Sequence, residues 1–400
     1  MKILMVNKFL HPNGGSETYI FKLGKELIRQ GHEVQYFGME HEGRIVGNRA
    51  EIYTGNMDFH SGKLDKLLYP FKIIYSSEAA NKIRKVLEDF KPDVVHLNNF
   101  NFQLTPSIIY AVRKYEKAHQ KEVRLIYTAH DTQLVCPNHL MQNPVTLECC
   151  DACLSHGVGQ CIKRKCIHGS KAKSLLGAME ASLYKALKTY SKLDAIICPS
   201  NFLKTKLDTD SVLKQKTVVL HNFVDVEVEG ENCIKQDYIL YFGRYSQEKG
   251  IKTLLKACHN LPDIPFHFAG SGPLETEIKK VPNIERRGFL EGGALTKEIG
   301  QARLVVFPSE CYENCPFTVM EAQICRTPVL GSNLGGIPEL IQEGVTGELF
   351  ESGNVDELTE KIRNLWNQGE RLQTYTENCK NVKFDDVEEY VAKLLKIYQN

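Results

Sequence analysis

The sequence predicts an α/β protein with two doubly wound domains in tandem. Three observations support this fold class. Strand-like and helix-like segments alternate along all 400 residues, the strand segments are almost continuous apolar runs, and the alternation pauses around residues 217–236. Continuous apolar strands are typical of parallel sheets with helices on both faces. An acidic, aperiodic pause is typical of a linker between two domains.

The first domain is expected to span residues 1–222, with strands at 2–9, 32–38, 93–99, 124–131 and 194–200. Residues 18–30 have helical periodicity, and Gly31 can end that helix. The second domain is expected to span residues 223–385, with strands at 238–244, 266–272, 284–290, 303–309 and 327–332. Ligands of such sheets bind beyond the carboxyl ends of the strands, so motifs that directly follow strands are the candidates for function.

The composition excludes several classes of protein. Lysine plus arginine number 50 and aspartate plus glutamate 49, which argues against a dedicated nucleic-acid-binding protein. No apolar run approaches the roughly 18 residues that span a bilayer, and the start MKILMVNKFL lacks the features of a signal peptide. We therefore expect a cytoplasmic protein, with peripheral contact at the inner face of the membrane as a further expectation.

Two glycine-rich turns join a strand to a helix. Gly14 and Gly15 lie in HPNGGSE (11–17), and Gly270 and Gly272 lie in FAGSGPLE (268–275). Glycine permits close approach of a ligand to the backbone, and a helix N-terminus offers free N–H groups to an anion. Neither turn matches the dinucleotide fingerprint, so ordinary strand-to-helix turns remain an alternative.

Two cations follow the first strand of the second domain. In YFGRYSQEKG (241–250), Arg244 comes directly after the strand and Lys249 precedes the next helix. A guanidinium can bind a diphosphate in two places and an ammonium acts as a point charge. The alternative is a pair of solvated surface cations.

The stretch FPSECYENCPFTVMEA (307–322) places Glu313 in a loop and Glu321 in a predicted helix. Pro316 is expected in the first turn of that helix, where its missing N–H costs nothing. Phe317 and Thr318 then offer backbone N–H groups at the positive end of the helix dipole. A phosphate suits that position, and the two carboxylates suit sugar hydroxyls on either side of it. A solvated glutamate and a helix-face glutamate are the alternative.

These motifs, in this order along nearly the whole chain, resemble those of family-4 retaining glycosyltransferases, which have the GT-B fold. The family's mark is two glutamates separated by seven residues and followed by Gly-Gly-x-Pro-Glu, which correspond here to Glu313, Glu321 and GGIPE (335–339). GRYSQEKG resembles the family's diphosphate-binding arginine and lysine. HPNGGSE resembles its N-terminal glycine loop, and YTAHD resembles its active-site histidine, here His130.

The resemblance implies two Rossmann-like domains with the active site in the cleft between them. It implies an N-terminal domain that binds the acceptor, a C-terminal domain that binds the donor, and a helix at 386–400 that packs back on the N-terminal domain. The implied catalytic residues are His130, Arg244, Lys249 and Glu313. The implied donor-binding residues are Gly14, Gly15, Gly270, Gly272, Asn314, Pro316, Phe317, Thr318 and Glu321.

The predicted reaction is transfer of a sugar, with retention, from a UDP- or GDP-sugar to a saccharide or lipid-linked saccharide in surface-polysaccharide or glycoconjugate synthesis. The resemblance implies no metal or other cofactor for transfer. Asp208 and Asp210 form a D-x-D triplet after a short helical stretch, which we interpret as a surface turn. Two alternatives remain open: a nucleotide-sugar epimerase on the same fold, and a non-catalytic subunit that binds nucleotide-sugars.

A cysteine-rich insert occupies residues 135–170 of the first domain. Cys150 and Cys153 have the spacing of a metal knuckle, and Cys136 and Cys166 can complete a four-thiolate site for structural zinc. Similar inserts occur in a surface-polysaccharide subset of the family, which favours this interpretation. Reduced thiols packed in a loop are the alternative.

Residues 152–179 contain no acidic side chain but five lysines and arginines, and an amphipathic helix follows. A basic patch beside an apolar stripe suits an anionic membrane surface. A solvated basic loop and a helix that faces the core explain the pattern equally well.

Overall fold

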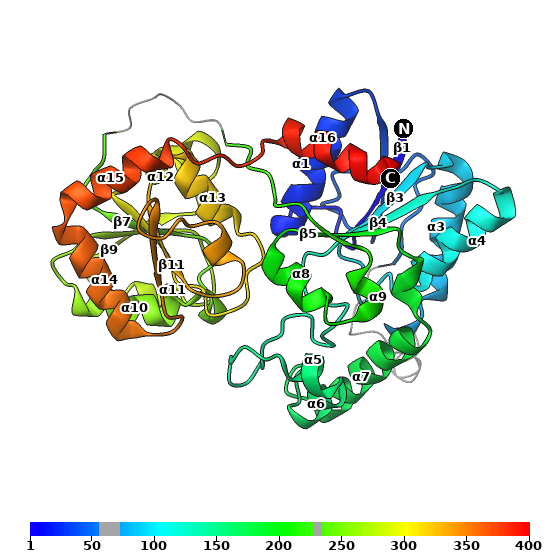
Figure 1. The fold of residues 1–400 in the computed structure, drawn as a ribbon, viewed down its shortest axis with the longest axis horizontal. Helices are drawn as coiled ribbons and strands as arrows, with labels where there is room; N and C mark the ends of the chain where they lie inside the picture. Colours follow the sequence, from blue (N-terminus) through cyan, green and yellow to red (C-terminus); the bar gives the residue numbers. More distant parts are fainter. Residues whose placement is uncertain (56–72, 227–233) are drawn as a thin grey trace. The chain divides into compact units, whose positions relative to one another are not determined.

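A computed structural model describes residues 1–55, 73–226 and 234–400, and it divides into two compact units (Figure 1). Unit 1 comprises Met1–Met141, Asp151–His221 and Val387–Asn400. Unit 2 comprises Gln142–Cys150 and Asn222–Asp386. Part of the predicted linker, residues 227–233, lies outside the described residues.

Unit 1 contains a parallel sheet in the order β2-β1-β3-β4-β5-β6. Its strands are β1 (Lys2–Val6), β2 (Glu33–Phe37), β3 (Val94–Leu97), β4 (Arg124–Thr128), β5 (Ala195–Cys198) and β6 (Thr217–Val219). Its helices are α1 (Gly15–Arg29), α3 (Ser77–Phe90), α4 (Ser107–His119), α5 (Ala152–His156), α6 (Gly159–Lys163), α7 (Lys171–Ala186), α8 (Asn201–Leu207), α9 (Ser211–Lys214) and α16 (Val387–Gln399), with a 3-10 turn η1 (Thr189–Lys192).

The two faces of this sheet are covered by different helices. Leu4 and Val6 of β1 belong to one buried cluster with apolar side chains of α3 and α4. Successive strand residues point to opposite faces, so the buried Ile3 and Met5 face the other layer. Helix α16 packs against α1, where the Tyr19 and Tyr390 hydroxyl oxygens lie 2.7 Å apart. Tyr398 of α16 bonds His96 Nδ1 of β3 at 2.7 Å.

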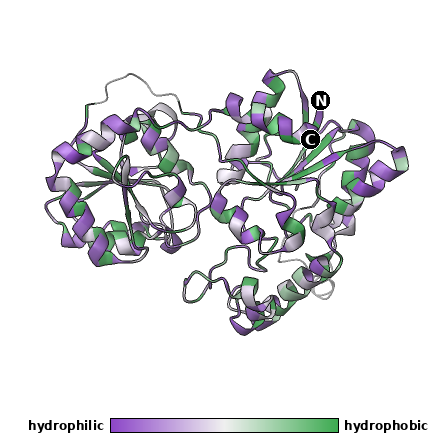
Figure 2. Ribbon diagram, in the orientation of Figure 1, coloured by the Kyte–Doolittle hydropathy of each residue, from purple (hydrophilic) through white to green (hydrophobic). Residues whose placement is uncertain are grey.

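Unit 2 contains a second parallel sheet in the order β12-β11-β10-β7-β8-β9. Its strands are β7 (Ile239–Phe242), β8 (Phe266–Ala269), β9 (Ile284–Gly288), β10 (Leu304–Phe307), β11 (Val329–Ser332) and β12 (Gly347–Phe350). Its helices are α10 (Ile251–Asn260), α11 (Glu275–Ile278), α12 (Gly292–Gln301), α13 (Phe317–Ile324), α14 (Val355–Asn367) and α15 (Gly369–Cys379), with 3-10 turns η2 (Gln247–Lys249) and η3 (Ile337–Glu339). Figure 2 shows that helices in both units carry hydrophobic and hydrophilic residues, as expected for helices that cover a sheet.

The predicted α/β class with two doubly wound sheets is confirmed. The strands are shorter than their predicted runs, mostly at their carboxyl ends, because the last residues of each run already belong to the loop that follows. Strand β12 was not predicted, because the run GELF has only four residues after a turn. No helix in the described part of the chain is long and apolar enough to cross a membrane.

The cysteine-rich insert is divided between the units. Its helices α5 and α6 lie together with α7, which follows the insert, in unit 1, to one side of the sheet (Figure 1). Residues Gln142–Cys150 instead group with unit 2, whereas the sequence placed the whole insert in the first domain. An antiparallel bridge joins Gln142 to Cys149, and Gln142 Nε2 donates a 3.0 Å hydrogen bond to the Glu310 carbonyl oxygen. The helical part and the bridged part of the insert therefore have different packing partners.

Candidate active site

The carboxyl edge of the unit 2 sheet is built by loops whose backbones touch. A Cβ at Gly270, after β8, would lie 2.0 Å from the carbonyl oxygen of Gly243, after β7. Gly250 has φ +73°, and a Cβ there would lie 1.8 Å from the carbonyl oxygen of Pro308, after β10. Side chains are sterically excluded at these positions, so the loops that carry Arg244, Lys249 and Glu313 are held at one edge.

Lys249 and Glu313 form the central ion pair of this edge. Lys249 Nζ lies 2.5 Å from Glu313 Oε1, which also accepts a 2.9 Å hydrogen bond from Ser309 Oγ. The Glu313 side chain is 15% exposed and the Lys249 side chain 31%. Burial has the largest single effect on the pKa of Lys249 and lowers it, but the Glu313 carboxylate and other nearby groups together hold that pKa above its usual value. The Lys249 ammonium is therefore charged at neutral pH, and its contact with Glu313 orients it.

The GGIPE turn holds the Glu313 backbone in place. Gly335 has φ +63°, and a Cβ at this position would lie 2.5 Å from the Glu313 carbonyl oxygen. Gly336 N–H donates a 2.7 Å hydrogen bond to the same oxygen. Glycine is required at residue 335 by both its left-handed backbone and this close approach. The second half of the family motif thus positions the first glutamate of the pair.

Helix α13 begins beside this loop. Phe317 is its first residue and Pro316 is the N-cap, so the prediction that Pro316 lies within the first turn is wrong by one position. The proline has extended backbone, which is the usual conformation of an N-cap. Among the described residues, the backbone N–H groups of Phe317 and Thr318 have no acceptor, and no side chain caps the helix. Glu321 lies one turn further along and is half-buried.

Arg244 follows β7 on an exposed loop. Its carbonyl oxygen accepts a 2.8 Å hydrogen bond from the Tyr241 hydroxyl, which fixes the backbone. Its guanidinium forms no ion pair within the described part of the chain, in contrast to Lys249. Unit 2 therefore presents one cation already paired and one cation available to a ligand.

In unit 1, His130 follows β4 and is held by an asparagine. His130 Nε2 lies 2.9 Å from Asn98 Oδ1, and Asn98 Nδ2 donates to the His96 carbonyl oxygen at 3.4 Å. This orientation of the amide assigns the proton to Nε2 and leaves Nδ1 as an acceptor. Burial lowers the pKa of His130 to about 4, so the imidazole is neutral at physiological pH. His130 is thus suited to hydrogen bonding rather than to acid catalysis.

The Gly14–Gly15 turn leads directly into α1, which begins at Gly15. Glu17 in its first turn is buried and accepts hydrogen bonds from Asn7 Nδ2 at 2.8 Å and Ser16 Oγ at 3.0 Å. Asn99 Nδ2 donates to Ser16 Oγ at 2.8 Å. The structure therefore adds polar residues that sequence reasoning missed, all at carboxyl ends of strands or the start of α1: Asn7, Glu17, Asn98 and Asn99. Asparagines directly after the apolar runs of β1 and β3 were the available signal.

The structure brings Lys249 and Glu313 together and places Asn314, Pro316, Phe317 and Thr318 around the start of α13. A Cβ at Gly272 would lie within 2.8 Å of backbone atoms of Tyr245, so this glycine also packs directly against a neighbouring backbone. Gly14, Gly15 and His130 belong to unit 1, so their place beside a donor sugar remains a prediction.

The D-x-D triplet has a structural role. Asp210 is the N-cap of α9 and accepts from the Val212 N–H at 2.9 Å and the Leu213 N–H at 3.4 Å. Asp208 ends α8, pairs with Lys204 and accepts from Thr217 Oγ1 at 2.6 Å. These contacts support the interpretation of the triplet as a turn.

The cysteine insert differs from the predicted zinc site. In the described part of the chain, no group of three or more His, Cys, Asp or Glu side chains has a geometry that could hold a metal ion. Burial raises the pKa of Cys136 and of Cys161 to about 12, and both thiols lie within electrostatic range of Cys153 and Cys166. Cys161, which was not selected from the sequence, lies within electrostatic range of three of the predicted ligands, Cys136, Cys153 and Cys166.

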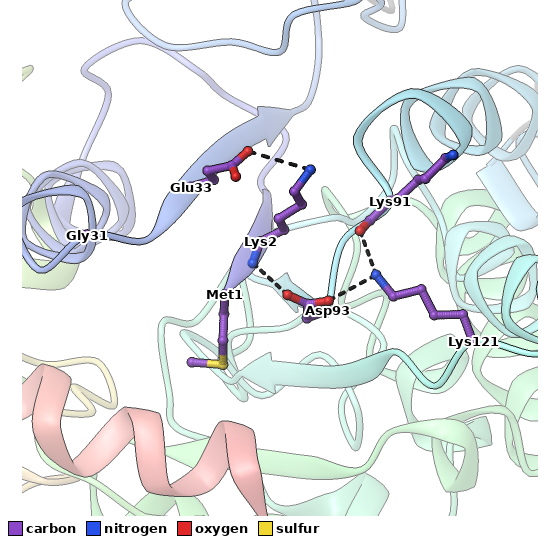
Figure 3. A pocket seen from close by; sticks show the side chains of 7 residues that line it. All are labelled: Met1, Lys2, Gly31, Glu33, Lys91, Asp93 and Lys121. Carbon is purple, nitrogen blue, oxygen red and sulfur yellow. Dashed lines mark hydrogen bonds and ion pairs between the residues drawn. The ribbon is translucent and has the colours of Figure 1, made fainter.

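A separate pocket opens at the opposite, amino edge of the unit 1 sheet (Figure 3). Most of its lining charges already have partners. Asp93 accepts from the Lys2 backbone N–H at 2.8 Å and from Lys121 Nζ at 2.9 Å, and Lys2 Nζ lies 3.7 Å from Glu33. The paired charges and the position at the amino ends of strands argue against a ligand site.

Comparisons with known proteins match this chain to glycosyltransferases over most of its length. The family described as Glycosyltransferase Family 4 matches residues 13–228, and Glycosyl transferases group 1 matches residues 229–382. The uncharacterized glycosyltransferase MJ1178 of Methanocaldococcus jannaschii is 25% identical over 364 residues, which cover 87% of this chain and 95% of that protein. Sulfoquinovosyl transferase SQD2 of Arabidopsis thaliana is 33% identical over 134 residues, 32% of this chain and 26% of that protein.

Solved structures share the fold over nearly the whole chain. Anabaena Alr3699/HepE in complex with UDP matches with a TM-score of 0.68 and 16% identity, covering 99% of this chain and 100% of that one. Sucrose-phosphate synthase from Thermosynechococcus elongatus matches with a TM-score of 0.67 and 16% identity, covering 100% and 98%. With the family match spanning more than half of the residues, the chain belongs to glycosyltransferase family 4 and has the GT-B fold.

Proposed function

We propose that this glycosyltransferase transfers a hexose, with retention of anomeric configuration and without a metal, from a UDP- or GDP-sugar to a saccharide or lipid-linked saccharide acceptor. The reaction takes place in the cytoplasm and serves the synthesis of surface polysaccharide or glycoconjugate. Unit 2 binds the donor and unit 1 binds the acceptor. The observation that carries the proposal is the edge of unit 2, where Arg244, the Lys249–Glu313 pair and the start of α13 are held by glycine contacts.

The charges at this edge suit a diphosphate. The guanidinium of Arg244 is exposed and not paired with any described residue, and Lys249 is oriented by Glu313. Together they neutralise the leaving nucleotide as negative charge develops on its phosphate oxygen. The N–H groups of Phe317 and Thr318 donate to the same phosphates at the positive end of α13. No reorganisation of the protein is needed at the moment of reaction.

The two glutamates hold the neutral parts of the donor. Glu313 bonds Lys249 and Ser309 through Oε1, so its other carboxylate oxygen can accept from hydroxyls of the transferred sugar. Glu321 accepts from the nucleotide ribose one helical turn beyond the phosphates. Neutral His130 accepts through Nδ1 from a sugar hydroxyl, with Asn98 fixing the ring. Each carboxylate thus orients a sugar without acting as a base.

In the transfer step, the bond between the anomeric carbon and the phosphate oxygen breaks and a bond to the acceptor hydroxyl oxygen forms on the same face. The acceptor's proton moves to the departing phosphate oxygen, which balances the charge. Arg244 and Lys249 stabilise that oxygen before it takes the proton. The protein's contribution is therefore positioning and electrostatic stabilisation.

The solved structures of Anabaena HepE with UDP and with UDP-glucose support a nucleotide-sugar donor, because they share this fold. The test is a panel of UDP- and GDP-sugars with the purified chain, scored first for donor hydrolysis and then for transfer to saccharide acceptors. Proton NMR of the product should show the donor's anomeric configuration, and EDTA should leave the rate unchanged. Formation of an epimeric nucleotide-sugar without acceptor would overturn transfer, and a strict Mg²⁺ or Mn²⁺ requirement would overturn the metal-free mechanism.

The zinc site also remains a proposal, now with Cys136, Cys153, Cys161 and Cys166 as the candidate ligands. Four thiols in one neighbourhood suit structural zinc, but their side chains do not adopt ligand geometry here, so binding requires rotation of the side chains. Zinc would close the insert and takes no part in transfer.

A further inference from the structure

Helix α7 has its larger apolar side chains on the outside. Its buried side chains are mostly small: Ser174, Gly177, Ala178, Glu180 and Tyr184. Its exposed side chains include Leu175, Met179 and Leu183, which are 47%, 54% and 41% exposed, and Leu187 directly after the helix is 54% exposed. A spacing of four residues places these side chains along one side of the helix. This arrangement is the reverse of a helix that buries its apolar face against a core.

The inner face of α7 packs against the rest of unit 1. A Cβ at Gly177 would lie 2.4 Å from Ile167 Cδ1, so α7 approaches the insert closely at this glycine. Ser174 Oγ accepts a 3.0 Å hydrogen bond from the Ile167 N–H, and the Tyr184 hydroxyl donates to the Ile74 carbonyl oxygen. These contacts fix the rotation of the helix. The exposure of its apolar side is therefore built into the packing.

The surroundings of the apolar side are strongly basic. Residues 161–188 contain seven lysines and arginines and a single acidic residue, Glu180. Glu180 is buried on the inner face, and burial raises its pKa to about 7. Lys185 pairs with Asp210 at 3.3 Å. The other six form no ion pair with any described residue and are exposed: Lys163, Arg164, Lys165, Lys171, Lys173 and Lys188.

We propose that α7 docks on an anionic lipid bilayer. In this arrangement Leu175, Met179, Leu183 and Leu187 enter the boundary between headgroups and acyl chains, and the flanking lysines and Arg164 lie among anionic headgroups. The positive charge around the apolar side favours a lipid surface rather than a second copy of the chain as the partner. Two copies facing each other would bring two basic clusters together. The docking holds the enzyme at the surface where a lipid-linked acceptor would lie.

The test is co-flotation of the full chain with vesicles of pure phosphatidylcholine or of phosphatidylcholine with 30% phosphatidylglycerol. Binding should be strong only to the anionic vesicles and should weaken at high salt. The variant Leu175→Ser/Met179→Ser/Leu183→Ser should lower the partition coefficient by more than about tenfold. Lys171→Glu/Lys173→Glu should lower it at least as much, because each basic side chain near an anionic surface contributes about fivefold.

Matched controls come from other helices of unit 1. Ile28→Ser removes an apolar side chain of α1 that is 54% exposed, and Lys114→Glu/Lys117→Glu reverses two exposed charges on α4. Both controls should bind vesicles like the wild type. Donor hydrolysis should be unchanged in every variant, since α7 carries none of the donor-binding residues.

A second measurement does not depend on removing apolar side chains. Trp366 is the single tryptophan of the chain, so Leu175→Trp in a Trp366→Phe background provides a reporter on α7. Its emission should shift to shorter wavelength with anionic vesicles and be quenched by brominated lipid. Equal binding to both kinds of vesicle, wild-type partitioning of the triple variant, or a dimer that the triple variant dissociates would each overturn the proposal.

Discussion

The carboxyl edges of the two sheets use different chemistry. The unit 2 edge carries formal charges, with Lys249 and Glu313 2.5 Å apart and Arg244 exposed. The unit 1 edge contains the buried Glu17 but is otherwise built mostly from amides, hydroxyls and histidine, with Asn98 orienting a neutral His130. A diphosphate needs compensating charge, whereas sugar hydroxyls need neutral hydrogen-bonding partners. The contrast indicates that one fold, used twice, is specialised by the few residues after each strand.

The strongest test of this contrast removes the charges of unit 2. Arg244→Ala and Lys249→Ala should each lower kcat at least about a hundredfold, because each removes a preorganised stabiliser of the leaving group. Lys252→Ala, which removes an exposed lysine three residues further on, should have little effect. Steady-state kinetics with the best donor measure kcat for each variant. Near-normal turnover in both site variants would contradict the assignment of the diphosphate site.

The two glutamates should differ, because they are predicted to hold different parts of the donor. Glu313→Ala should lower kcat about thirtyfold, since it removes a charged partner of both Lys249 and the sugar. Glu321→Ala should instead weaken binding of the free nucleotide about tenfold. Calorimetric titration with UDP or GDP, beside kinetics, separates the two effects. If both variants lost kcat and nucleotide affinity to the same extent, the two glutamates would not have different roles.

The glycine contact behind Glu313 can be tested with a matched pair. Gly335 and Gly344 both have left-handed backbone, with φ +63° and +75°, but only Gly335 lies against the Glu313 backbone. Alanine at either site should cost about 1–2 kcal/mol of stability from the backbone alone. Gly335→Ala should in addition lower kcat about tenfold by displacing Glu313, whereas Gly344→Ala should keep wild-type kcat. Equal kcat in the two variants would argue against the role of this turn.

The uncharged state of the buried histidines in unit 1 can be tested through the pH dependence of stability. His96 bonds Tyr398 and Thr128, each at 2.7 Å, and burial lowers its pKa to about 3. The unfolded chain binds a proton near pH 6.5 and the folded chain does not, so stability is full above pH 6.5 and is lost as pH falls toward 3. At pH 4.5 this should amount to about 3 kcal/mol.

His96→Gln should flatten this dependence of the thermal midpoint on pH, although it lowers the midpoint at pH 7. His259→Gln, at an exposed position of α10, is the control and should retain the wild-type profile. An unchanged acid slope in His96→Gln would show that other groups cause the loss of stability.

The smallest expected effect on catalysis concerns the insert. Protein purified without added metal should carry about one zinc per chain if the thiols form a closed site. Cys161→Ser should lose the zinc while Cys150→Ser retains it, and donor hydrolysis should be normal in both. Metal analysis by mass spectrometry measures the stoichiometry. Zinc-free wild-type protein, or loss in Cys150→Ser only, would contradict the revised ligand set.

The parallel sheets could be predicted because their buried strands are continuous apolar runs, such as ILYF before Arg244. The residues proposed to bind the donor could be selected from the sequence because the glutamate spacing and the GGIPE turn are local in the chain. The pairing of Lys249 with Glu313 could not, since 64 residues separate them and only the adjacency of β7 and β10 brings them together. Asn98 was missed for the same reason, because its partner His130 follows the neighbouring strand β4. The outward side of α7 was also beyond prediction, because periodicity shows that a helix is amphipathic but not which face is buried.

Helix α16 has a consequence for the order in which the chain folds during synthesis. Unit 1 contains the first strand, yet Tyr390 and Tyr398, which bond Tyr19 and His96, follow all of unit 2 in the chain. A ribosome therefore releases every residue of unit 2 before unit 1 can complete its α1 layer. Until then Tyr19 and His96 lack these partners. A released chain that ends before residue 387 should accordingly protect unit 2 from protease better than unit 1.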